Sequence, residues 1–367
     1  MSINDWNELN TGLLKHGFDR FYDTLLSRAN SSSEVFQSLF NHDTPQSICT
    51  VFLRDKTVNA TAKLENNKYY IGINAALPCI IHFTFNMLLR TPYYFPELGD
   101  RNDYDDEYRQ FPNGIPLSLP NDVPIEDALW GIVSTSRPSS NKRAVAATLL
   151  TEIAMSFCVY HELAHIQTGH VISAKEMLDE KEFLELSAIT RSVADRKIFR
   201  VWEYEADKLS SIMLSANDML DKNNQKHFCE AFEIDMDNDI YKLFGVILSS
   251  LYVLFHLFNQ MIPGSKSSSN HPHPTLRYSY VSSEIVNFIS RHFNYSIKET
   301  NKFKKDIAQF VTMTQTAWLE LGLPIPVDIT SKNFHKWALK RIDKLEYNRK
   351  NINGLYLHRA WVYPFSE

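Results

Sequence analysis

Two histidines with a glutamate between them are the residues of this chain best placed to do chemistry. They stand in the sequence His161-Glu162-Leu163-Ala164-His165. On a helix, residues four apart are neighbours on one face, so both imidazoles can reach one metal ion. Glu162 lies one step round the helix, where it can hold a water molecule and take its proton. Zinc suits these ligands and lowers the pKa of a water molecule toward neutrality. The motif indicates attack of water on a carbonyl; the alternative is an exposed helix with two solvated histidines.

A third zinc ligand is expected from the acidic segment that begins at Trp202. Glu203 and Asp207 are four residues apart and share a helical face, whereas Glu205 points elsewhere. We therefore expect Glu203 to bind the metal and Asp207 to hold a ligand imidazole by a hydrogen bond. The alternative is an ordinary charged face of a helix.

His170 is the other candidate for the third ligand. One group of zinc enzymes uses a histidine six residues after the second one, with glycine at the third step. Here Gly169 and His170 lie four and five residues beyond His165, so the spacing differs by one. We interpret His170 as a residue at the end of the helix.

The two motifs together resemble those of gluzincin metallopeptidases of the CAAX-prenyl-protease and heat-shock membrane-protease type. Their second motif, E-[FY]-x-A-D, is matched by the segment from Glu203 to Asp207. The resemblance extends over about residues 55 to 280, with the segment 91–141 unmatched. It implies a zincin-like peptidase fold, zinc as the cofactor and a protein or peptide as the substrate.

That family often adds a His-Pro pair followed by an arginine six residues after the histidine. His271 and Arg277 fit this spacing, although His273 also precedes a proline. The resemblance implies that His271 or His273 stabilises the oxyanion, and that Arg277 pairs with Glu203 or Asp207. The alternatives are a histidine in a turn and an arginine on the surface.

A second resemblance is to the small cytoplasmic gluzincins of the phage-exclusion Lit peptidase type. They carry a similar H-E-x-x-H near the middle of the chain, and a His-Pro pair with a downstream arginine. This resemblance implies cleavage of a host protein, in the Lit case a translation elongation factor, as an abortive antiviral defence.

Helices are expected to carry both motifs. A helical pattern runs from about residue 143 to 168 and closes on Gly169, and another is expected at 192–220. Strands are expected at 48–54 and at Tyr69 to Asn74, the second entered through a turn at residues 66 and 67. The second strand is either an internal strand or one that pairs with an extended substrate. The family's Asn-Ala pair ahead of an edge strand is matched loosely at Asn59, a further oxyanion candidate.

The expected fold class is α+β, a mainly helical zincin-like metallopeptidase fold with a small mixed sheet. We expect a peptidase domain over residues 1–280 and a C-terminal helical region over 281–367 packed on it. Seven of the 15 prolines and an acidic run fall at 91–141, which we interpret as a long loop or a lid inserted in the first domain.

Composition limits the classes of partner and the cellular compartment that we expect for the protein. The formal net charge of -5 argues against a nucleic-acid partner, because phosphate binding requires a basic face. The four cysteines form no disulfide framework, and no secretory signal opens the chain, so we expect a cytoplasmic protein. The apolar run from Phe244 to Phe258 is only 15 residues long and is shorter than a membrane span. Peripheral membrane contact is not expected.

A zinc-binding regulatory or scaffold protein that retains a peptidase fold is the competing class. Glu162 separates the two hypotheses, because this carboxylate does not bind the metal and a scaffold has no need for it. Its presence favours a peptidase.

Overall fold

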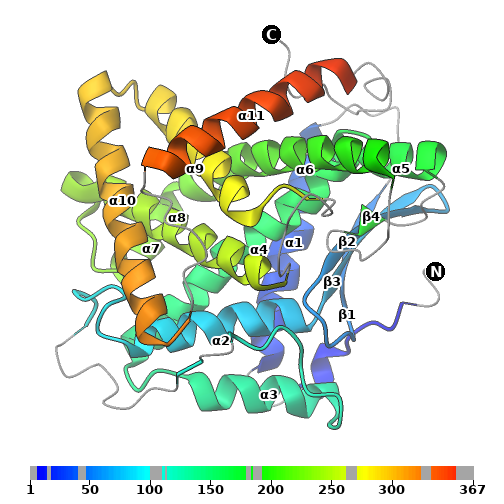
Figure 1. The fold of residues 1–367 in the computed structure, drawn as a ribbon. Coiled ribbons are helices and arrows are strands. Elements are labelled where there is room, and N and C mark those ends of the chain that lie inside the picture. The colour runs from blue at the N-terminus through cyan, green and yellow to red at the C-terminus, as the bar shows by residue number, and fades with distance from the viewer. Residues whose placement is uncertain are drawn as a thin grey trace.

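The computed structural model describes residues 6–14, 18–39, 47–99, 110–111, 114–178, 183–184, 192–261, 271–323 and 332–352. Within these ranges the fold is α+β and mainly helical, as expected, with one small mixed sheet. Figure 1 shows the sheet on one side of the molecule and most of the helices gathered beside it. The helices are α1 (Phe18–Leu39), α2 (Ala76–Arg90), α3 (Ile125–Ser136), α4 (Asn141–Gln167), α5 (His170–Leu178), α6 (Val193–Leu214), α7 (Lys222–Ala231), α8 (Met236–Met261), α9 (Pro274–His292), α10 (Ile297–Glu320) and α11 (Lys332–Ile352).

The sheet has the strand order β1-β3-β2-β4. The strands are β1 (Ile48–Leu53), β2 (Ala60–Glu65), β3 (Lys68–Asn74) and β4 (Phe183–Leu184). β1 runs parallel to β3, while β2 runs antiparallel to both β3 and β4. The expected strands at 48–54 and 69–74 are confirmed as β1 and β3.

A tight turn fixes the register of β2 on β3. Asn66 and Asn67 both have positive φ, at 49° and 61°, as a two-residue hairpin turn of type I′ requires. β3 therefore lies inside the sheet, between β1 and β2, and is the internal strand of the two alternatives. β2 lies between β3 and the two-residue strand β4, which pairs with Thr61 and Ala62 and forms the edge of the sheet on that side.

Helix α4 is the central helix of the molecule and packs against α2, α6 and α8. It is 27 residues long and contains neither glycine nor proline. Almost every side chain from Leu149 to Gln167 is buried. The helix ends where Gly169 takes a φ of 75°, a left-handed conformation that glycine adopts without steric cost. The chain then turns directly into α5 at His170.

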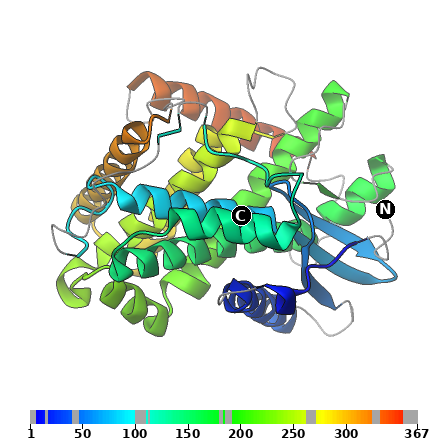
Figure 2. The same cartoon turned by 90° about the horizontal axis from the view of Figure 1, so that it is seen from below.

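Two of the described helices, Asn141–Gln167 and Asp239–Gln260, are long and apolar enough to cross a membrane. The interior of the protein covers 78% and 83% of their apolar windows, which is the burial of core helices. Figure 2, seen from below, shows other helices on several sides of them.

The structure adds detail to two parts of the expected organisation. The segment 91–141 is not a plain loop, because it contains α3, which packs against α2. Residues 100–109 and 112–113 of that segment, with most of its acidic run, lie outside the described residues. The boundary expected at residue 280 falls inside α9, and buried residues on both sides of it belong to one hydrophobic core.

Candidate metal centre

The side chains of the three expected metal ligands meet between α4 and α6. His161 Nε2 lies 3.0 Å from His165 Nε2, and these atoms lie 3.3 and 3.5 Å from the two oxygens of Glu203. Zinc bonds of about 2.0–2.1 Å in a tetrahedral arrangement place neighbouring ligand atoms about 3.3 Å apart. The three side chains are therefore close enough together to hold one metal ion. Within the described residues, this is the cluster of His, Cys, Asp and Glu whose atoms could hold a metal.

The positions follow from the packing of two helices. α4 presents His161 and His165 from adjacent turns, and α6 lies along it and presents Glu203. Ser192 begins α6 as its N-cap by accepting a hydrogen bond from the Asp195 amide. Glu162, next to His161 on α4, is fully buried like the three ligands.

Asp207 binds the far side of His161. Its Oδ1 lies 3.0 Å from His161 Nδ1, so the other ring nitrogen is free to face the metal position. Arg277 donates two hydrogen bonds of 2.8 Å to the same carboxylate, and the Tyr280 hydroxyl donates a third of 2.5 Å. Both donors come from α9, which therefore ties a third helix to the centre.

The charges around the cluster offset the cost of burial. Burial raises the pKa of Glu203, but His271 and His161 outweigh it and hold that pKa well below the ordinary value. Burial also raises the pKa of Asp207, and Arg277 and His161 together lower it overall. Both carboxylates are therefore held in the anionic form.

The two ligand histidines differ in their pKa. Burial and the neighbouring His161 hold the pKa of His165 well below its usual value, so this ring stays neutral. Burial lowers the pKa of His161 too, but hydrogen bonds to Asp207 and Glu203 raise it well above the ordinary range. A proton held there without a metal must leave when a cation binds.

The two candidate oxyanion histidines have different places. His271 Nδ1 lies 2.9 Å from Glu203 Oε2, so this side chain belongs to the centre. His273 caps α9 instead, since its Nδ1 accepts a hydrogen bond from the Thr275 amide at 3.2 Å. Arg277, besides its bonds to Asp207, lies 3.7 Å from Glu203. Asn59 lies just before β2, and its carbonyl accepts the amide of Asn74.

Two residues with unexpected positions complete the centre. His170, interpreted above as a helix-end residue, begins α5 and places Nδ1 3.0 Å from Nδ1 of His165. Its Nε2 lies 3.2 Å from Glu205, the carboxylate expected to point elsewhere. The Trp202 ring stacks on His170 with 5.2 Å between centroids. Only the Gly169-His170 pair at the helix end signals this arrangement in the sequence.

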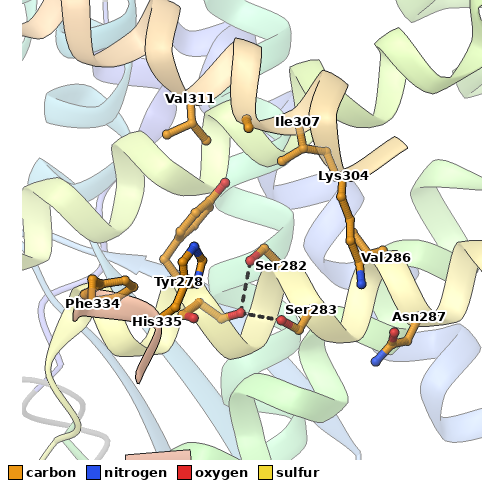
Figure 3. Close-up of a pocket in the computed structure, with 12 residues that line it drawn as sticks. Tyr278, Ser282, Ser283, Val286, Asn287, Lys304, Ile307, Val311, Phe334 and His335 are labelled. Atoms are coloured by element: carbon orange, nitrogen blue, oxygen red, sulfur yellow. Dashed lines mark hydrogen bonds between the residues drawn. The ribbon is translucent and has the colours of Figure 1, made fainter. Parts of the chain in front are cut away.

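A cavity of about 600 Å³ lies elsewhere, between α9, α10 and the first turn of α11. Figure 3 shows Lys304, Ile307 and Val311 on one side, and Ser282, Ser283 and Tyr278 on the other. None of its lining residues belongs to the metal cluster. The cavity is therefore separate from the candidate centre.

Comparison with known proteins gives no match: no family model, curated protein or solved structure is similar to this chain.

Proposed function

We propose that this protein is a zinc-dependent endopeptidase with a zincin-like active site. The observation that carries the proposal is the meeting of His161, His165 and Glu203, close enough together to hold one metal ion, with Glu162 beside them. Zinc bound there would polarise a substrate carbonyl and lower the pKa of a water molecule.

The protein's own groups divide the remaining work. Glu162 accepts the proton of the attacking water and passes it to the leaving amine. His271, which lies against Glu203, donates a hydrogen bond to the developing oxyanion. Asp207 and Arg277 hold His161 and Glu203 in place.

The proposed substrate is a protein of the cytoplasm, bound in extended form. An added strand would pair with β4, the edge strand beyond β2, and β2 is one of the two strands that pack against α4. The ligands and Glu162 are buried, and a centre closed in this way suits a protease that stays inactive until it is triggered. The resemblance to Lit-type peptidases makes a host protein cleaved in antiviral defence the leading substrate class.

Proteomic mapping of new protein N-termini tests this function. Cells that express the wild-type chain are compared with cells that express Glu162→Gln, in which the amide cannot accept a proton. Loss of a general base lowers a rate by about 10²–10⁴-fold, so new N-termini should appear only with the wild type.

Glu152→Gln is the matched control. Glu152 is a second buried carboxylate on α4, where it pairs with Arg28 away from the ligands. This variant should cleave as the wild type does. Equal biological effects with no N-termini specific to the wild type would favour the scaffold hypothesis instead.

A further inference from the structure

The second ring nitrogen of each ligand histidine has a different partner. His161 meets the carboxylate of Asp207 directly. His165 meets another imidazole, that of His170, which in turn meets Glu205. His170 is fully buried and Glu205 nearly so, at 2% exposure. Burying these polar groups costs free energy that apolar residues of the same size would not cost.

We propose that Glu205 and His170 act as positioning residues that fix the tautomer of His165 for metal binding. The inference rests on the proposed zinc site and adds two residues to it. Hydrogen-bond chemistry decides which atom donates in each hydrogen bond between His165, His170 and Glu205. A carboxylate of Glu205 only accepts, so Nε2 of His170 carries the proton. Nδ1 of the neutral His170 ring then holds a lone pair and accepts from His165.

The consequence reaches the metal position. Nδ1 of His165 must carry its proton, so its Nε2 presents a lone pair beside His161 and Glu203. The opposite tautomer would put a proton where the ion should bind. Glu205 thereby does for His165, through His170, what Asp207 does for His161 by direct contact. Trp202, stacked on His170, holds the ring in the required plane.

Zinc affinity of purified full-length variants tests the proposal. His170→Leu removes the acceptor and should weaken zinc binding about 10–100-fold, the usual effect of losing a partner of a metal-binding histidine. His170→Asn places an amide oxygen near the former Nδ1 and should restore most of the affinity. His82→Leu is the control, because His82 is a buried histidine that contacts Thr151 rather than a ligand. It should bind zinc like the wild type.

A double-variant comparison separates positioning from packing. Glu205→Leu alone should weaken zinc binding, but it should have no further effect in the His170→Leu background, because Glu205 acts only through His170. Additive losses, or equal losses for His170→Leu and His170→Asn, would show that the residues only fill space and would overturn the proposal.

The test also separates this inference from the function itself. Wild-type zinc affinity in both His170→Leu and Glu205→Leu would overturn the positioning role of these residues (the relay from Glu205 through His170 to His165). It would leave the proposed zinc site intact. A wild-type protein that binds no zinc would overturn both. If His170→Leu fails to fold, Glu205→Met keeps most of the side-chain volume and removes the hydrogen-bond acceptor. It should weaken zinc binding several-fold, and unchanged affinity would contradict the relay.

Discussion

At the scale of single residues, Asp207 connects the candidate metal centre to the rest of the protein. Its two oxygens receive hydrogen bonds from His161, Arg277 and Tyr280, and all four groups are buried. The Arg277 guanidinium also lies over the rings of Phe255 and Phe258, so it cannot turn toward water when its partner is lost. One carboxylate thus orients His161, a proposed zinc ligand, and neutralises a buried cation.

Asp207→Asn should therefore lower both stability and zinc affinity. An amide has no charge to offset Arg277, and breaking a buried ion pair costs about 3–5 kcal/mol. Denaturant unfolding of the metal-free protein measures this loss. Tyr280→Phe, which removes one hydrogen bond to the same carboxylate, should cost only about 1.5–3 kcal/mol. An Asp207→Asn protein as stable as the wild type would show that this network does not stabilise the fold.

Helical spacing in the sequence predicted much of this centre. His161, His165, Glu203 and Asp207 fall at intervals of four, which puts each pair on one face wherever the helices pack. The partnership of His170 with Glu205 was not predictable in this way. It depends on the turn at Gly169 and on how α6 lies against α4, and both are tertiary features.

At the scale of elements, strong local signals were interpreted correctly and weak ones were missed. β1 and β3 contain apolar and β-branched runs, and the glycine after α4 marks its end. β2 was missed because Ala-Thr-Ala-Lys-Leu-Glu lacks such a run. Its place depends on the Asn66-Asn67 turn and on Lys63, which is buried, pairs with Glu65 and lies over the Trp6 ring.

The contact of α2 with α4 should make stability depend on pH. Burial lowers the pKa of His82, on α2, to about 4. In the unfolded chain a histidine has a pKa of about 6.5. As the pH falls from about 6.5 to about 4, His82 becomes protonated in the unfolded state but stays neutral in the folded state. Stability should therefore fall by up to about 1.4 kcal/mol per pH unit from this residue.

His82→Gln removes this titration and leaves the other buried histidines unchanged. Denaturant unfolding at pH 7, 6 and 5 should show that the wild type loses stability more steeply than the variant below pH 6.5. Above pH 7 the difference between the two proteins should be constant. Parallel curves over the whole range would contradict a buried, neutral His82.

At the scale of the whole molecule, one hydrophobic core surrounds the candidate metal centre. α4, α6, α8 and α9 enclose it, and the core continues into α10 and α11. The α+β class was predictable from helical periodicity and two strand signals. The continuity of the core past residue 280 was not predictable, because it depends on how α9 packs. This helix contributes Arg277 to the centre and also packs against α10 and α11.

The measurement that tests the account most directly is the zinc content of purified protein by elemental analysis. The account predicts about one zinc per chain in the wild type, the number that a single structural or catalytic site binds. Glu162→Gln should retain the zinc, because Glu162 accepts a proton and only His161, His165 and Glu203 bind the metal. Glu203→Ala and His161→Ala should lose most of it. A wild-type chain without zinc after growth in zinc-replete medium, or full zinc in Glu203→Ala, would contradict the centre described here.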